Sequence, residues 1–492
     1  MKLSTYLYAG LLLYTCFVIY VGFVGAKKIK GLSDFAVASQ SMGPISLGLA
    51  FAASFFSAAT FLGYVGFAYA WGASALWIFL AIFGGSTLGF IVIAKGVRSS
   101  NTKIKALSLP DWLGEMYHSD ILRALISIII LIQLFYVAGQ LSAGGTLLSG
   151  LLGMEYSTAV IAVTVVTVIY VTLGGLFADV YTSIGQTCLM MIAGVIVFLS
   201  GFVFFKGGIT EVSTILAAQN PNFITTLNPD SLHMYSYATV FGVILIEFAF
   251  SGQPQLLTKI LALKDPRDMK KMIWTWIIAA FCCMLVIFGG LYMLAINPHL
   301  PKPDYAVVEY VKLYFHPIIS TILAISIVAA LMSTACGLLL VMTTCISNDL
   351  FLKTLVKNHI IHMEEEKAQN LAFAMTKILP AVFGFICVLM TLNPPKFMGV
   401  MVWIGISGVA SATLAPMLIA IIWPERINAK AAIAGAIAGE AVYMAVYLFS
   451  NIEKSVMAAG AWGLIVSFIV MWVLSSGRKK EEFITDSKNT EA

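Results

Sequence analysis

Long apolar runs separated by short polar connectors constrain this chain more than any other feature of its sequence. A helix needs about 20 apolar residues to cross the hydrocarbon core of a bilayer, and about thirteen runs reach that length. Because lipid offers no partners to backbone groups, such runs favour helices over irregular chain. We therefore predict an all-α polytopic membrane protein with spans near 5–26, 44–71, 74–96, 121–150, 157–177, 179–206, 236–258, 272–296, 317–348, 368–392, 397–423, 430–450 and 453–476.

The composition agrees with lipid as the main solvent. Of the 492 residues, 60% are hydrophobic and 11% are charged, against roughly a quarter charged in an average soluble domain. The net charge of +5 is too small to indicate nucleic acid as a partner. The seven cysteines lie inside apolar runs and show neither CxxC nor Cys/His spacing, so the sequence favours neither a disulfide framework nor a zinc site.

The distribution of positive charge predicts the orientation in the membrane. If the N-terminus is outside, most of the 29 Lys and Arg residues lie on the cytoplasmic side, as the positive-inside rule requires. Lysines directly after the first run also favour a retained helix over a cleaved signal peptide. We expect an odd number of spans, the N-terminus outside and the C-terminus inside, with the cytoplasmic charges in 27–30, 95–123, 259–271, 353–367, 426–430 and the tail.

Two spans combine small and polar residues in an unusual way. The second reads LGLAFAASFFSAATFLGYVGFAYAW from position 47, and a later one contains ALMSTACGLL from position 330. Small residues permit close helix packing, and they also permit unwinding where freed carbonyls face a cavity. A plain packing seam is therefore one interpretation. The other is a transporter ion site, for which two such spans in corresponding halves are the usual sequence indication.

At these segments the chain resembles the sodium:solute symporter family, which includes proline, pantothenate, monocarboxylate, sialic acid and sugar symporters. The resemblance runs nearly end to end and rests on six motifs in order, each weak alone. They are SDFAVASQSMGPISLGLAFAASFFSAATFLG (33–63), LSLPDWLGEMYHSDILR (107–123), TLGGLFADVYTSIGQ (172–186), GQPQLLTKILALKD (252–265), ALMSTACGLLLVMTTCISNDLF (330–351) and WPERINAKAAIAGAIAG (423–439).

The resemblance implies a fold that composition does not show. That fold is a LeuT-like inverted repeat of five plus five helices within a single transmembrane transporter domain covering 1–492. The implied division is a peripheral helix at 5–26, a first repeat at 44–206, a second repeat at 236–423, peripheral helices at 430–476 and a cytoplasmic tail at 477–492.

The resemblance also implies a sodium site between the broken second span and the span around position 333. Its ligands would be the carbonyls of Ala53 and Phe56 together with Ala330, Ser333 and Thr334. Sodium is a hard cation, so carbonyl and hydroxyl oxygens suit it. The alternative for the two hydroxyls is a hydrogen bond back to a carbonyl one turn earlier, which is common in membrane helices.

The chain departs from the family pattern at two positions. Proline-type members carry an acid where this chain has Phe55, and many members have Thr-Asp where it has Thr182-Ser183. We therefore expect a mostly neutral sodium site, or one supplied by other oxygens. The departures leave both the coupling ion and a proline substrate open.

The substrate is expected beside the predicted break in the second span. Tyr136 and Gln140 lie one turn apart on one helical face, and a buried glutamine can orient a polar solute or link two helices. Phe250 and Trp403 can form apolar walls or gates, or simply pack. The other candidates for facing the solute are Ser54, Phe55, Ser57 and Thr60.

Glu247 is an acidic residue inside a predicted membrane span. It lies in the middle of the span VFGVILIEFAFSGQP, shortly before a second predicted break at Ser251-Gly252. An acid inside a membrane is costly and is a functional candidate by default. It can bind a cationic group of the solute, ligate an ion or carry a proton, and the alternative is a hydrogen-bonded structural glutamate.

Together these features predict a secondary active transporter of the plasma membrane. The leading hypothesis is Na⁺-coupled symport of a small carboxylate-bearing solute, such as a monocarboxylate or a pantothenate-like compound. The alternative is a Na⁺- or H⁺-coupled symporter for a proline-like amino acid, and a solute sensor or a channel is less favoured. No catalytic motif indicates an enzyme. Partners are the solute, sodium and the bilayer, and the sequence does not indicate an oligomeric state.

Overall fold

The computed structural model describes residues 3–392, 398–449 and 455–475. Within these ranges every regular element is a helix, and 11 helices are long and apolar enough to cross a membrane. The predicted all-α polytopic class is therefore confirmed. The tail predicted at 477–492 lies outside the described residues.

The interior of the bundle is built by helices from both halves of the chain. They are α3 (Pro44–Phe55), η2 (Ala59–Tyr64), α4 (Val65–Trp71), η4 (Ala81–Ser86), α6 (Thr87–Ile104), α9 (Gln133–Leu152), α10 (Tyr156–Phe204), α12 (Tyr237–Phe250), α13 (Pro254–Leu261), α14 (Met269–Met284), α15 (Phe288–Ile296), α17 (Pro317–Thr344) and α19 (Met398–Ile422).

The remaining helices flank the bundle or lie at its ends. They are α1 (Leu3–Ala26), α2 (Leu32–Val37), α5 (Leu76–Leu80), α7 (Leu109–Met116), α8 (Asp120–Ile129), α11 (Gly208–Gln219), α16 (Ala306–Tyr314), η10 (Cys345–Val356), α18 (Glu365–Thr391), α20 (Ala429–Phe449) and α21 (Val456–Leu474).

Two of the 11 apolar helices are long enough to cross twice. The continuous segment Ala59–Ile104 has 46 residues and α10 has 49, and 49 residues at 1.5 Å each reach about 73 Å, more than twice the ~30 Å hydrocarbon core. Each contains a glycine with positive φ, Gly72 at +67° and Gly175 at +47°, where the chain leaves the helical path. The expected number of thirteen spans stays a prediction.

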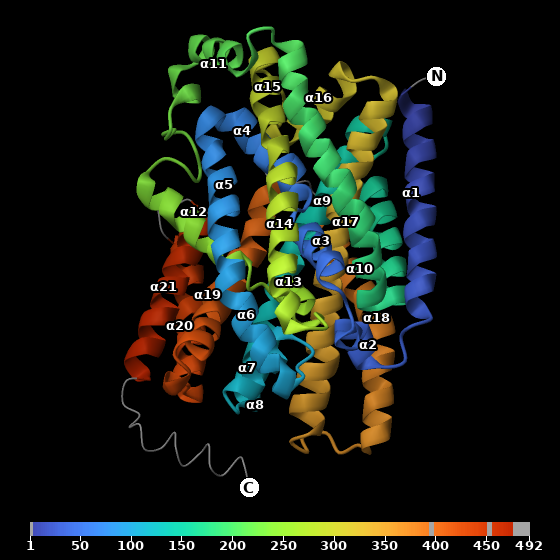
Figure 1. Ribbon diagram of the computed structural model, residues 1–492, viewed down its shortest axis with the longest axis vertical. Coiled ribbons are helices and arrows are strands. Elements are labelled where there is room, and N and C mark those ends of the chain that lie inside the picture. Colours follow the sequence, from blue (N-terminus) through green and yellow to red (C-terminus); the bar gives the residue numbers. More distant parts are fainter. Residues whose placement is uncertain (1–2, 393–397, 450–454, 476–492) are drawn as a thin grey trace.

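The bundle has a buried centre and a more exposed rim. In the segment Pro317–Val356, 89% of the residues in the most apolar 18-residue stretch are buried. The corresponding share is 22% in α1 and 28% in both α18 and α20. In Figure 1, α1 and α18 lie along one side of the bundle and α20 and α21 along the other. The broken helices and α17 therefore occupy the centre, where protein rather than lipid surrounds them.

The two described ends of the chain lie at opposite ends of the bundle (Figure 1). Helix α1 begins at the end of the bundle that carries α11 and α16, whereas α21 ends toward the end that carries α2, α7 and α8. An odd number of crossings requires this arrangement, and the orientation itself stays a prediction. The charge count needs a correction, because Lys259, which it placed in a cytoplasmic connector, is fully buried in α13. Arg98 and Arg123, which were counted on the same side, are buried as well.

Both predicted interruptions are present. Helix α3 ends at Phe55, and Phe56 turns out of the helix with φ −78° and ψ 103° before η2 begins. Helix α12 ends at Phe250, and the chain passes through Ser251 and Gly252 to an extended Gln253 before α13 starts. Each interruption frees backbone groups in the buried centre, where side chains must satisfy them.

Candidate functional site

Helix α17 crosses the broken end of α3 at two hydroxyl groups. Ser333 Oγ lies 2.7 Å from the carbonyl oxygen of Ala53 and 3.0 Å from that of Ala330. Thr334 Oγ1 lies 3.4 Å from the Ala53 carbonyl and 3.5 Å from that of Ser54. All these residues are buried. The structure therefore brings four of the five predicted sodium ligands together.

The fifth predicted ligand, Phe56, lies at the break itself. In a regular helix the Thr60 N–H would bond to the Phe56 carbonyl, but here it donates to Ser57 at 2.9 Å. The Phe56 carbonyl therefore loses its helical partner. The set of carbonyl and hydroxyl oxygens on α3 and α17 has the chemistry that a hard monovalent cation requires.

The structure also contains the alternative hydrogen bond of Ser333, which returns to a carbonyl of its own helix. Its hydroxyl can bond back to Ala330 within α17, yet the shorter contact reaches across to Ala53. A hydroxyl that served only to hydrogen-bond within its own helix would not need a partner on α3. The two interpretations are compatible, because the same oxygens that pack the helices together can turn toward an ion.

The predicted substrate residues form one buried group. The Phe55 and Phe250 rings are 4.3 Å apart, and the Phe250 and Tyr136 rings 6.3 Å. Tyr136 also hydrogen-bonds to Ser57, and the ring centres of Trp403 and Tyr64 are 6.4 Å apart. None of the candidates, which also include Ser54, Thr60, Gln140 and Glu247, is more than 2% exposed. The two breaks thus meet through an aromatic contact, and the site is closed to water.

Several polar atoms in this group have no hydrogen-bond partner. Gln140 Oε1 accepts a hydrogen bond from the N–H of Ala58 at 2.9 Å. The oxygen of this amide therefore satisfies a backbone group that the break in α3 leaves without a helical partner. Its Nε2 is buried and unpartnered, as are Ser54 Oγ, Glu247 Oε1 and Trp403 Nε1. Buried polar atoms without partners are rare and costly. Four such atoms occur among the predicted solute residues, on α3, α9, α12 and α19, and unpartnered buried polar atoms are a feature of ligand sites.

Glu247 faces η4 from α12. Ser86 Oγ lies 2.8 Å from both the carboxylate Oε2 and the main-chain oxygen of Glu247, and Ser251 Oγ donates to the Ser86 carbonyl at 2.6 Å. Among the described residues no basic side chain forms an ion pair with Glu247. One carboxylate oxygen therefore stays available for a proton or a cationic group.

Sequence reasoning missed two further groups. Asp179 on α10 and Lys259 on α13 form an ion pair in which neither side chain is exposed. Gln133 Nε2 donates to Gln253 Oε1 at 2.9 Å and to Gln255 Oε1 at 3.0 Å, beside the second break. A charged residue inside an apolar run was a usable signal for the first group. The second gives no signal before the helices are packed.

A charged network lies at the end of the bundle that carries α7 and α8. Arg123, 1% exposed, lies 2.7 Å from Glu115 and 3.5 Å from Asp111 and also pairs with Asp120. Lys353 on η10 reaches Asp111 at 2.7 Å. This network ties α7 and α8 to the segment that follows α17.

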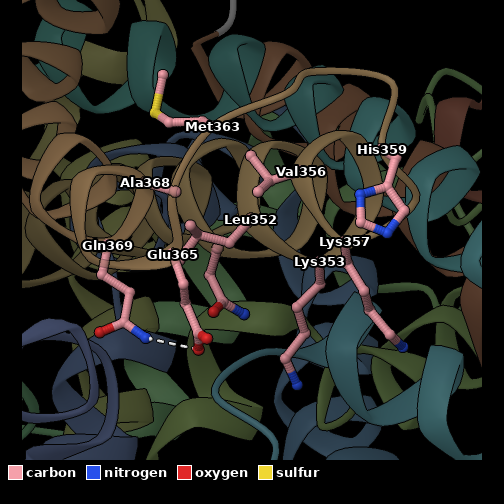
Figure 2. Close-up of a pocket in the computed structure, with 10 residues that line it drawn as sticks. Leu352, Lys353, Val356, Lys357, His359, Met363, Glu365, Ala368 and Gln369 are labelled. Atoms are coloured by element: carbon pink, nitrogen blue, oxygen red, sulfur yellow. Dashed lines mark hydrogen bonds between the residues drawn. The ribbon is translucent and has the colours of Figure 1, made fainter.

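Next to this network, a cavity of about 530 Å³ opens between η10 and α18. Lys353, Lys357 and His359 lie on one side of it, and Glu365 and Gln369 on the other (Figure 2). None of the predicted sodium or solute residues lines this cavity.

Comparison with known proteins assigns the chain to a family. Residues 35–439 match the sodium:solute symporter family. The chain belongs to this family. The match confirms the predicted resemblance and the location in a membrane, and it fits a transporter rather than an enzyme.

Curated members of the sodium:solute symporter family align along most of the chain. The osmoregulated proline transporter OpuE of Bacillus subtilis is 25% identical over 476 residues, which cover 94% of this chain and 92% of that protein. The sodium/pantothenate symporter of Escherichia coli is 26% identical over 440 residues, 86% of each. These identities show a family of solute symporters without deciding the solute.

A solved structure confirms the type of fold. A Na⁺-coupled sialic acid symporter, described in a substrate-bound outward-open state, superimposes with a TM-score of 0.79 at 18% identity. The match covers 96% of this chain and 97% of that one. At this identity the likeness shows the fold alone, so the residues that bind ion and solute here must be argued from this structure.

Proposed function

We propose that this protein is a Na⁺-coupled symporter of a small carboxylate-bearing solute. The observation that supports the sodium site is the Ser333–Ala53 contact, in which a buried hydroxyl of α17 lies against a carbonyl freed by the break in α3. The proposed ligands are the carbonyl oxygens of Ala53, Phe56 and Ala330 and the hydroxyl oxygens of Ser333 and Thr334. Membership of a family of sodium:solute symporters supports the choice of sodium.

The solute site is proposed at the unpartnered polar atoms beside this ion site. Ser54 Oγ, Gln140 Nε2 and Trp403 Nε1 are all able to donate hydrogen bonds. An excess of donors favours an anionic group such as a carboxylate. Phe55, Phe250 and Tyr136 would enclose the rest of the solute, because their rings already touch across the two breaks. Ser57 and Thr60 complete the proposed wall.

A proline-like amino acid is the second candidate solute, and Glu247 favours it. A carboxylate oxygen without a partner in the buried centre is a natural counter-charge for an ammonium group. A zwitterion would then place its carboxylate at the donors and its amine at Glu247. If Glu247 instead carries a proton, coupling to H⁺ replaces or accompanies coupling to sodium.

The broken helices support the proposed repeat. The first repeat, 44–206, opens with α3 and its break, and the second, 236–423, opens with α12 and its break. Corresponding interrupted helices are the usual sign of inverted repeats with a central binding site. On this proposal 5–26 and 430–476 are peripheral, in keeping with the low burial of α1 and α20.

Transport in proteoliposomes tests the proposal. The purified protein would be reconstituted and offered radiolabelled pantothenate, lactate, proline and glucose, with an inward gradient of either sodium or choline. Accumulation of lactate or pantothenate only with sodium would support the leading proposal, and accumulation of proline would favour the second candidate. Accumulation driven by a proton gradient without sodium would overturn the ion assignment.

A further inference from the structure

The ion pair between Asp179 and Lys259 is the most deeply buried pair of charges among the described residues, with 0% exposure on both sides. Removing two charges from water is costly, and attraction within the pair often does not repay that cost. Charges kept at such depth in a membrane protein therefore call for a functional reason. The pair joins α10 to α13, which follows the second break.

The pair lies beside the proposed ion site. Gly337 on α17 follows Ser333 by one helical turn and has no side chain. A methyl group added at Gly337 would lie 3.7 Å from Lys259 Nζ and 3.4 Å from Ser54 Oγ. The ammonium and the broken end of α3 are therefore both within 4 Å of one point. Lys259 therefore brings a positive charge to the part of α17 that lies one turn from Ser333.

The surroundings of Asp179 resemble a cation site that the lysine has filled. One carboxylate oxygen pairs with Lys259, and the other, Oδ1, is buried without a partner. Ser183 lies one turn further on the same helical face, and its buried hydroxyl is also unpartnered. Without the ammonium, these oxygens would form a negatively charged site for a hard cation.

We propose that Lys259 is a built-in counter-ion that occupies the place of a second coupling ion, so that the protein binds one sodium ion. This inference rests on the proposed function, because it presumes the sodium site at Ser333 and Thr334. A buried carboxylate needs one compensating cation, and a tethered ammonium supplies it at all times. A second sodium ion would find this carboxylate neutralised and a like charge close by.

Equilibrium binding of ²²Na⁺ to the purified full-length protein tests this inference without knowledge of the solute. The wild type should bind one ion with a Hill coefficient near 1. Lys259→Met should expose the carboxylate and bind a second ion. Lys259→Arg, which keeps the cation, and the double variant Asp179→Asn/Lys259→Met, which removes both charges, should each bind one ion.

A further variant keeps the inference testable if Lys259→Met does not fold. Asp179→Asn leaves the ammonium uncompensated beside the sodium site, so the sodium Kd should rise at least tenfold, and adding Lys259→Met should restore it. Two sodium ions in the wild type, one ion in folded Lys259→Met, or an unchanged Kd in Asp179→Asn would each overturn the inference. Absence of sodium binding to the wild type would instead overturn the proposed function.

Discussion

The hydroxyl of Ser333 lies 2.7 Å from the main-chain oxygen of Ala53, 280 residues earlier in the chain. This contact joins α17 to α3 two residues before α3 ends. A hydroxyl and a freed carbonyl that face each other in a buried centre are both able to turn toward a cation. The contact therefore links the break, the ion site and the packing of the two proposed repeats.

Replacing either hydroxyl of the proposed ion site should weaken sodium binding. Ser333→Ala and Thr334→Ala each remove one oxygen ligand, and a polar contact to a charge is worth about 1.5–3 kcal/mol. We expect the sodium Kd, measured with ²²Na⁺, to rise about tenfold or more. Ser326→Ala is a matched control, because Ser326 is equally buried in α17 but bonds to Ile322 and Leu189. Unchanged sodium binding in both site variants would rule out this assignment.

Neutralising Glu247 should separate the two candidate solutes. Glu247→Gln preserves an acceptor for Ser86 but removes the charge, so a zwitterionic solute should lose affinity about tenfold or more, whereas a simple carboxylate should not. Uptake of proline and lactate in proteoliposomes, across a pH series, gives the comparison. Glu440→Gln is the control, since Glu440 is also a mid-helix acid bonded to a serine, Ser411, but lies in α20. Normal transport of both solutes by Glu247→Gln at every pH would remove Glu247 from the site.

A side chain at Gly175 should destabilise the long helix α10 at its bend. Gly175 has φ +47° and ψ −145°, and an added methyl group would lie 2.7 Å from the Phe35 ring and 2.9 Å from its main-chain oxygen. Backbone strain alone costs about 1–3 kcal/mol, and the clash adds to it. Gly153→Ala isolates the strain, because φ there is +68° and nothing lies within 4 Å. Thermal unfolding in detergent should show a clearly lower Tm for Gly175→Ala than for Gly153→Ala, and equal Tm values would contradict this account.

Breaking the charged network at α7 and α8 should destabilise the protein. Arg123→Gln leaves Asp111, which is fully buried, with Lys353 as its one charged partner among the described residues. Loss of one member of a buried ion network typically costs about 3–5 kcal/mol. Lys357→Gln should change stability by only about 0–1 kcal/mol, since the Lys357 side chain is 60% exposed and 3.9 Å from Asp120. Denaturant or thermal unfolding checks both variants, and similar losses in the two would refute the prediction.

Protonation of His233 should make the protein less stable in acid. Burial lowers the pKa of His233 to about 3, and its Nδ1 lies 2.8 Å from Ser455 Oγ. Because the folded-state pKa is below the unfolded value near 6.5, the unfolded chain takes up the proton first as pH falls. The free energy of unfolding should drop by about 1.4 kcal/mol per pH unit below about 6.5. His233→Gln, which cannot titrate, should reduce the acid dependence of Tm, and an unchanged dependence would contradict this.

Much of the architecture was predictable from sequence. The apolar runs and the small-residue segments around Phe56 and Ser251 predicted helices and breaks where the structure has them, because span length and backbone freedom are local properties. The family resemblance placed Ala53, Ser333 and Thr334 at one site, and the structure brings them together. Lys259 was misplaced, because charge counting along a sequence cannot tell an exposed lysine from a buried one.

Composition and ordered motifs are enough to identify a helical membrane protein that belongs to the sodium:solute symporter family. Which polar groups meet depends on how the helices pack. Packing paired Asp179 with Lys259 across 80 residues and closed Phe55 against Phe250. Within the described parts of the chain, it gave Glu247 no basic partner. The physical reason is that burial and charge compensation depend on neighbours from distant helices, and these are determined only when the helices pack.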